Sequence, residues 1–149
     1  MANPSDELTE KAAILDVIHR YALALDRKDW KLLDRCFTQD ARLDYTTAGG
    51  PAGSYRTELR AWLIEILEPV PVLQHFVSNV IIELDGDRAR ATVYGVSVNQ
   101  FDSNEGGPTL VCGGIYHDRL EKGSEGWRFS ERVEERTFVD GELPDLSNG

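Results

Sequence analysis

The chain has 149 residues, 41% of them hydrophobic, and a formal net charge of −10. This length suits one core, so we expect a single domain over residues 1–149, ordered from about 6 to 140 with a short flexible tail. Basic residues are scattered singly, which disfavours nucleic acid as a partner. No apolar run is long enough to span a membrane, and the polar, acidic start lacks a secretory signal, so we expect a cytoplasmic protein without membrane contact.

The first half of the chain has mainly helical periodicity. Apolar residues between 6 and 25 form one broad stripe with polar residues opposite, which predicts a long amphipathic helix. Residues 30–37 keep helical spacing for a second, short helix, and a third is predicted from about 57 to 67. Between these two, "ARLDY" at 41–45 alternates like a strand and "TAGGPAGSY" at 47–55 is typical of a loop.

After the third helix the periodicity changes to two. Four strand-like segments are joined by turn signals such as Asp85-Gly86, which predicts an antiparallel meander. Helices followed by a sheet indicate an α+β architecture with the helices packed on one sheet face. Gly95, Gly113 and Gly114 suggest bends in long strands, and a bent sheet closed by helices is a cone with an internal pocket.

A titratable residue, His75, lies near the start of the first strand of this meander. A lone strand histidine is more often structural, so a functional role requires partners. Tyr21 and Asp26 near the end of the long helix and Tyr45 on the inner face of the first strand are the candidates. An N-cap role is an equal alternative for Asp26, and both tyrosines could be core residues with satisfied hydroxyls.

Strand alternation suggests which residues line the pocket. The odd positions of residues 88–101 begin apolar and become polar, as the lining of a cavity requires. His117 lies on the odd face of its strand with Ile115 and Arg119, either in the pocket or on its rim, and His75 is placed on one face with Val77, Asn79 and Ile81. Substrate contacts are expected from Trp62, Ser97, Asn99 and His117.

No metal site is expected, because the three histidines lie on separate elements without ligand spacing. Cys36 and Cys112 match no metal or redox spacing, so two reduced thiols are expected.

Four segments together carry a resemblance: "HRYALALDRKDW", "ARLDY", "QHFVSN", and "YHDRL" followed by "GWRFSERV". Over nearly the whole chain they resemble the SnoaL-like branch of the nuclear transport factor 2 (NTF2-like) superfamily, near scytalone dehydratase and bile-acid 7-alpha-dehydratase. The resemblance implies a cone-shaped fold. It also implies that Asp26 orients a catalytic His75, that Tyr45 polarises a substrate carbonyl, and that Tyr21 occupies the place of the bile-acid enzyme's catalytic tyrosine. Where scytalone dehydratase has a tyrosine and a second pocket histidine, this chain has Leu25 and Asn99.

The implied activity is that of a cofactor-independent dehydratase or isomerase. Its substrate would be a small hydrophobic cyclic carbonyl compound of polyketide, steroid or aromatic type. His75 would abstract a proton beside the carbonyl, followed by loss of a β-hydroxyl or by reprotonation elsewhere.

The resemblance leaves a second class open, a non-catalytic ligand-binding or assembly subunit such as the small subunit of a ring-hydroxylating dioxygenase. In that case side chains would fill the pocket and His75 would be structural. Under either reading a homo-oligomer, dimer or trimer, is implied.

Overall fold

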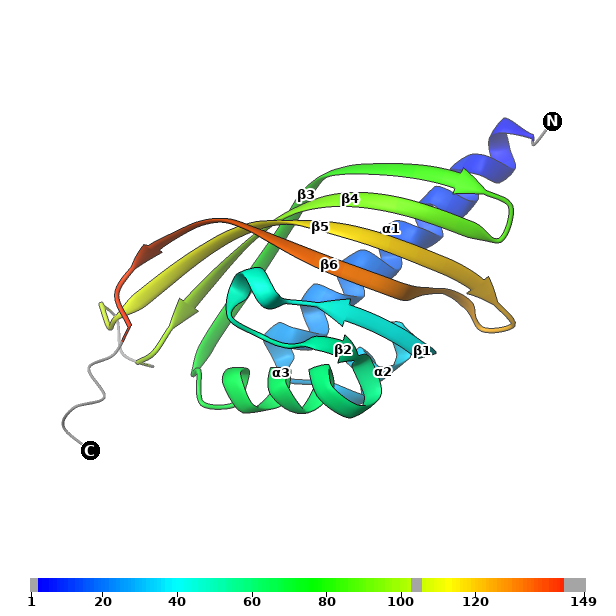
Figure 1. Ribbon diagram of the computed structural model, residues 1–149. Helices are drawn as coiled ribbons and strands as arrows, with labels where there is room; N and C mark the ends of the chain where they lie inside the picture. The colour runs from blue at the N-terminus through cyan, green and yellow to red at the C-terminus, as the bar shows by residue number, and fades with distance from the viewer. Residues whose placement is uncertain (1–2, 103–105, 144–149) are drawn as a thin grey trace.

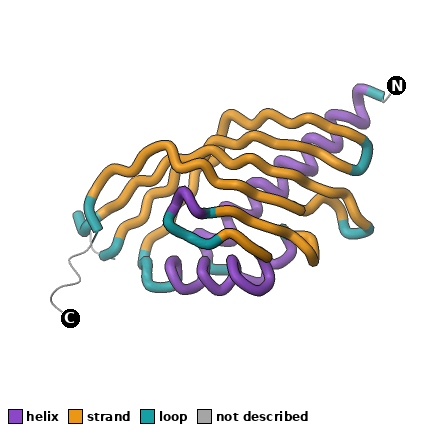
Figure 2. The backbone as a smooth tube through the Cα atoms, viewed as in Figure 1, coloured by secondary structure: helices purple, strands orange, loops and turns teal. Residues whose placement is uncertain are grey.

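Helices dominate the first half of the chain and long strands the second in the computed structural model, which describes residues 3–102 and 106–143 (Figures 1 and 2). The helices are α1 (Pro4–Arg27), α2 (Trp30–Arg35) and α3 (Arg60–Leu67). Two shorter turns, η1 (Thr46–Ala48) and the π-helical η2 (Tyr55–Leu59), precede α3. The strands are β1 (Phe37–Asp44), β2 (Ala52–Ser54), β3 (Val72–Asp85), β4 (Arg88–Gln100), β5 (Thr109–Gly123) and β6 (Gly126–Gly141).

The ends of the first two helices follow from local capping. The Asn3 side chain accepts a hydrogen bond from the Ser5 N–H at the start of α1. Lys28 ends α1 in the left-handed conformation, and its Nζ donates to the carbonyls of Glu68 and Val70, both at 2.8 Å. Asp29 caps α2 by accepting from a backbone N–H at 2.9 Å, so Asp29 fills the N-cap role that was the alternative for Asp26.

The sheet has the order β2-β1-β6-β5-β4-β3. The strands β3 to β6 form the predicted antiparallel meander. β1 lies outside this meander and pairs in parallel with β6, so the sheet as a whole is mixed. More than half of the chain separates these two strands, so no tight turn forces them to be antiparallel. The result is an α+β, NTF2-like cone with an unclosed sheet, and α1 and α3 lie on its concave side (Figure 1).

An irregularity in β3 changes which of its side chains face inward. The β3–β4 register shifts between Ser78 and Ile81, where Asn79 has φ 50°. The expectation that Ile81 shares a face with His75 is therefore wrong: Ile81 points outward and is 64% exposed. A one-residue bulge reverses the alternation of every later side chain in the strand.

The carboxyl-terminal end of the described chain belongs to the sheet, because β6 continues to Gly141. The rest of the expected tail, residues 144–149, lies outside the described residues. Both Cys36 and Cys112 are free thiols. None of the helices in the described ranges combines the length and apolar character that crossing a membrane would need.

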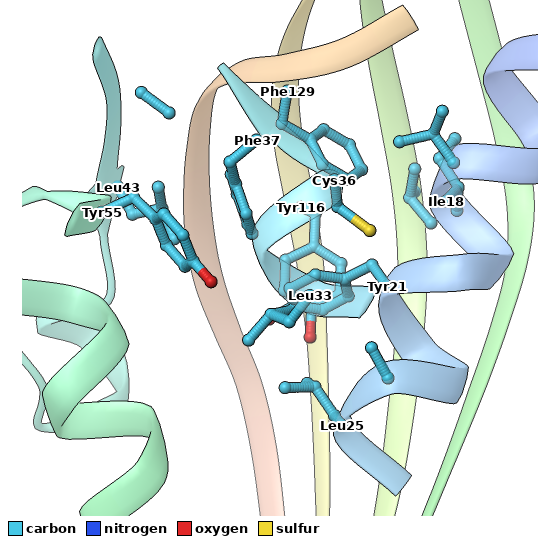
Figure 3. Close-up of a cluster of buried hydrophobic side chains, with 14 of the residues drawn as sticks. Ile18, Tyr21, Leu25, Leu33, Cys36, Phe37, Leu43, Tyr55, Tyr116 and Phe129 are labelled. Atoms are coloured by element: carbon cyan, nitrogen blue, oxygen red, sulfur yellow. The ribbon is translucent and has the colours of Figure 1, made fainter. Parts of the chain in front are cut away.

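The core lies between α1 and the concave sheet face (Figure 3). There, the Tyr21 ring meets those of Phe37, Tyr116 and Phe129 edge-on, with centroids 6.0, 6.1 and 6.1 Å away. These contacts fix Tyr21 at the inner end of the cavity described below.

Candidate functional site

The ring of His75 is held by the carboxylate of Asp26. Asp26 lies in the last turn of α1 and His75 near the start of β3. The His75 backbone N–H donates to Asp26 Oδ1 and Oδ2 at 3.1 and 3.0 Å, and the ring Nδ1 lies 2.6 Å from Oδ1. An ionised carboxylate only accepts hydrogen bonds, so the neutral ring carries its proton on Nδ1 and has a lone pair on Nε2.

His75 also lines a cavity of about 400 Å³ between the helices and the sheet, and Nε2 is the ring nitrogen that Asp26 does not hold. No residue in the described ranges forms a hydrogen bond with Nε2. This volume is typical of sites for small molecules. Several residues singled out from the sequence line the cavity together: Tyr21, Tyr45, Trp62, His75, Ser97 and Asn99.

Two tyrosine hydroxyls meet inside this cavity. The Oη atoms of Tyr21 and Tyr45 are 2.5 Å apart, and both residues are almost fully buried. Burial raises the pKa of Tyr21, although the positive charge of Arg132 opposes this effect, and burial raises the pKa of Tyr45 well above its usual range. Both phenols therefore keep their protons at neutral pH. One hydroxyl proton forms the hydrogen bond between the two tyrosines, and the other can be donated to a ligand oxygen.

Trp62 of α3 packs beside Tyr45, with ring centroids 5.7 Å apart. Gly50 permits this packing, because a Cβ there would lie only 2.5 Å from the Trp62 ring. The loop and α3 thus hold Tyr45 against the cavity.

A buried arginine, absent from the sequence-based candidates, lies under these rings. The Arg132 side chain is 1% exposed and forms two 2.7 Å hydrogen bonds to the Asp118 carboxylate. Its guanidinium carbon lies 4.2, 4.1 and 4.2 Å from the ring centroids of Tyr21, Tyr116 and Phe129. Although burial acts against the charge, Asp118 raises the pKa of Arg132 well above its usual range. Arg132 is therefore a fixed positive charge next to Tyr21.

The sequence-based candidates also lacked several residues that line the cavity, among them the polar side chains of Tyr116, Glu134 and Arg136. Regular alternation from the buried Trp127 and Phe129 would turn positions 134 and 136 outward. The β5–β6 register instead shifts between Phe129 and Glu131, which turns Arg132, Glu134 and Arg136 inward. The only sequence signal was the run of charged residues in "SERVEER", which is also typical of a solvated strand face.

The expected place of His117 is corrected by the structure. His117 pairs with Thr92 across β4 and β5 on the outer sheet face, and its Nε2 lies 2.7 Å from Glu135 Oε2. The inner positions of β5 are even-numbered, as the buried Tyr116 and Asp118 show. His117 therefore does not line the cavity.

Within residues 3–102 and 106–143, no three His, Cys, Asp or Glu side chains are grouped so that they could hold a metal ion. The polar groups of the cavity are instead suited to proton transfer and hydrogen bonding.

Comparisons with known proteins give the family of the chain. The family description "SnoaL-like domain" matches residues 6–133. The chain belongs to the SnoaL-like domain family. The uncharacterized protein Rv2910c of Mycobacterium tuberculosis (strain ATCC 25618 / H37Rv) is 33% identical over 132 residues, covering 89% of this chain and 88% of that protein.

Solved structures share the fold of this SnoaL-like chain at low identity. A protein from Novosphingobium aromaticivorans DSM 12444, provisionally named scytalone dehydratase, superposes with a TM-score of 0.82 at 19% identity and 99% coverage of both chains. Hexachlorocyclohexane dehydrochlorinase LinA-type3 from Novosphingobium barchaimii LL02 gives a TM-score of 0.78 at 16% identity and 97% coverage of both chains.

Proposed function

We propose that this SnoaL-like protein is a cofactor-independent lyase or isomerase acting on a small hydrophobic cyclic carbonyl compound. The observation that carries the proposal is the 2.6 Å contact between His75 Nδ1 and Asp26, which leaves Nε2 free toward a cavity containing two tyrosine hydroxyls. A base and a hydrogen-bond donor facing one ligand are the requirements for removing a proton beside a carbonyl.

In the proposed reaction, His75 Nε2 takes a proton from the carbon next to the carbonyl. The C–H electron pair forms a carbon–carbon double bond, and the carbonyl electrons move onto the oxygen. The free hydroxyl proton of the Tyr21–Tyr45 pair stabilises this oxyanion, and the charge of Arg132 lies behind Tyr21. Asp26 stabilises the imidazolium that forms.

The second step decides the class of enzyme. If the substrate has a hydroxyl on the β-carbon, the enolate expels it, and the imidazolium of His75 returns its proton to the leaving oxygen as water. If there is no such group, the same proton goes to another carbon and the product is an isomer. The dehydrochlorinase among the structural neighbours is named for another elimination on this fold.

The open cavity argues against the alternative of a non-catalytic subunit. That alternative predicts a pocket filled with side chains, whereas about 400 Å³ is open beside His75. It also gives no reason for a histidine ring whose second nitrogen has no partner in the described part of the chain.

We also propose that the protein is a homo-oligomer. The outer sheet face exposes several large apolar side chains in its central part: Phe76, Ile81, Tyr94 and Phe138. Apolar residues in such number on one face are typical of a surface that another protein copy covers. Light scattering on the purified protein tests this proposal: a monomeric mass would refute it.

Proton abstraction can be tested without knowing the natural substrate. The protein is incubated with 1-tetralone in D₂O, and exchange of the hydrogens beside the carbonyl is followed by NMR. The same protein is given 3-hydroxy-1-tetralone, whose loss of water to 1-naphthol is followed by absorbance. We expect exchange or dehydration with the wild type and at least a hundredfold slower reaction with His75→Gln.

His117→Gln is the matched control, because His117 also contacts a carboxylate but lies on the outer sheet face. It should react at the wild-type rate. Equal rates for the two variants would rule out His75 as the base.

A further inference from the structure

A second polar pair lies in the cavity on a different strand from His75. Glu134 and Arg136 are on β6, and Arg136 Nε donates to Glu134 Oε1 at 3.2 Å. Their side chains are 10% and 24% exposed. In the described ranges, neither Glu134 Oε2 nor the two Nη groups of Arg136 have a hydrogen-bond partner. The pair therefore has both an acceptor and donors available to a ligand.

Strand register places this pair across the cavity from His75. His75 is on β3, and β6 is three strands away, about 14 Å at the usual strand spacing. Along the strands, Arg136 is level with Val77, two residues beyond His75. Gly95 and Gly114 are neighbours on the two strands between, and Gly114 is directly opposite Arg136. Neither position has a side chain of its own: the Tyr116 ring lies against Gly95, 3.0 Å from where a Cβ would be, and the Glu134 side chain lies beside Gly114.

Thr47 of η1 holds the backbone between Glu134 and Arg136. Thr47 Oγ1 donates to the Glu134 carbonyl at 2.6 Å and accepts from the Arg136 N–H at 3.0 Å. The β5–β6 register shifts again directly after Arg136. Such bulges commonly direct a side chain toward a site, and here Thr47 holds the bulge in place.

The charges of the pair indicate what it can recognise. A substrate carboxylate would accept hydrogen bonds from Arg136 but would be repelled by the adjacent carboxylate of Glu134. A substrate ammonium would be attracted by Glu134 and repelled by Arg136. A neutral hydroxyl satisfies both, because it can donate to Glu134 Oε2 and accept from an Arg136 Nη group. An unsubstituted ring would leave both groups desolvated without a partner.

We propose that Glu134 and Arg136 form a hydroxyl-recognition site, so that the substrate is a ring compound with an alcohol or phenol at the end remote from the carbon that loses its proton. This inference rests on the proposed function for the orientation of the substrate. It assigns Glu134 and Arg136 to specificity and not to proton transfer.

Three ring ketones that differ at one position test the proposal: 1-tetralone, 6-hydroxy-1-tetralone and 6-carboxy-1-tetralone. Binding to the full chain is measured by calorimetry at pH 7. The wild type should bind the hydroxyl compound at least tenfold more tightly than 1-tetralone, and the carboxyl compound no more tightly than 1-tetralone.

Glu134→Gln should reverse this preference. The Gln amide can donate where the carboxylate only accepted, so the hydroxyl compound should no longer bind more tightly than 1-tetralone. The carboxyl compound is no longer repelled and should bind about tenfold more tightly than it does to the wild type. Arg136→Met should remove the hydroxyl advantage without the carboxyl gain. Glu131→Gln is the matched control, because Glu131 forms a comparable pair with Arg119 on the outer face, at 3.1 Å, and should change nothing.

Equal binding of the three compounds by the wild type would overturn the proposal, as would an equal change for all three in Glu134→Gln. Thermal melting of each variant verifies that it is folded. If Glu134→Gln does not fold, binding of the three compounds to Arg136→Met decides the test. The exchange assay on 1-tetralone separates the two proposals. Exchange without a hydroxyl preference refutes only the recognition site, and a hydroxyl preference without exchange of any probe refutes only the proposed activity.

Discussion

Replacing Asp26 by Asn tests the site most directly, because an amide cannot satisfy every contact of the carboxylate. With its oxygen toward His75 Nδ1, the Asn NH₂ would face the His75 backbone N–H, which now lies 3.0 Å from Oδ2. In the flipped orientation the NH₂ would donate to Nδ1. The ring would then carry its proton on Nε2, where it cannot act as a base.

The size of both effects follows from these contacts. Losing a hydrogen bond to a charged group costs about 1.5–3 kcal/mol, so we expect the free energy of unfolding to fall by about 2 kcal/mol. The effect on catalysis should be larger, because the wrong tautomer removes the base. In serine proteases, the corresponding Asp-to-Asn change lowers kcat by about 10⁴-fold, and we expect a loss of about 10³-fold or more here.

Deuterium exchange of 1-tetralone measures the catalytic loss, and urea denaturation measures the loss of stability. Asp29→Asn is the control, because Asp29 caps α2 and Asn is an equally good N-cap. An Asp26→Asn protein that is folded and exchanges within twofold of the wild-type rate would refute the assigned role of Asp26.

Three further predictions concern other parts of the site and its frame. Tyr45→Phe removes one of the two hydrogen-bonded hydroxyls, and exchange should slow by about 10²-fold in the same NMR assay, whereas an unchanged rate would exclude Tyr45 from carbonyl stabilisation. Arg132→Met should lower the free energy of unfolding by about 3–5 kcal/mol in urea, because it leaves the buried Asp118 carboxylate without its partner, and adding Asp118→Leu should restore most of that loss. Finally, burial alone would raise the pKa of Asp34, but hydrogen bonds, chiefly from Arg60, lower it in the folded protein. The ionised Asp34 therefore stabilises the fold fully above the unfolded pKa of about 3.9, and this stabilisation is lost as pH falls through the lower folded pKa. Asp34→Asn should therefore be less stable than the wild type at pH 7. In melting curves, this difference in stability should begin to narrow below about pH 4 and close below the folded pKa of Asp34.

Periodicity predicted much of the fold because it reports burial directly. The stripe of α1 and the alternation of β3 to β6 are dictated by which side faces the core, and both elements are found close to the predicted positions. The direction of β1 beside β6 was not predictable in this way, since a strand buried against a neighbour has the same alternation whether the pairing is parallel or antiparallel.

For the cavity, the sequence was informative about residues near the ends of elements. These residues are Asp26 at the end of α1, Tyr45 just after β1 and His75 near the start of β3. Their positions could be predicted without following the in–out alternation along a long strand, where a bulge would reverse it. The resemblance to related enzymes supplied the pairing of Asp26 with His75, which spacing alone could not. The distance of 2.6 Å agrees with that pairing, while the catalytic role stays a prediction.

The sequence-based approach failed where the backbone departs from regular geometry. One extra residue in β3, near Asn79, and one in β6, at Ser130, each reverse the inside and outside of the positions that follow. In β6 this holds as far as Arg136, after which the register shifts again. Without the second bulge, Arg132, Glu134 and Arg136 would face solvent, as their charges suggest. With it, Glu134 and Arg136 line the cavity in place of the odd-numbered residues of β6, and the buried cation of Arg132 lies behind Tyr21. The bulge at Ser130 therefore determines which ligand chemistry the cavity can accommodate, although Ser130 itself does not line it.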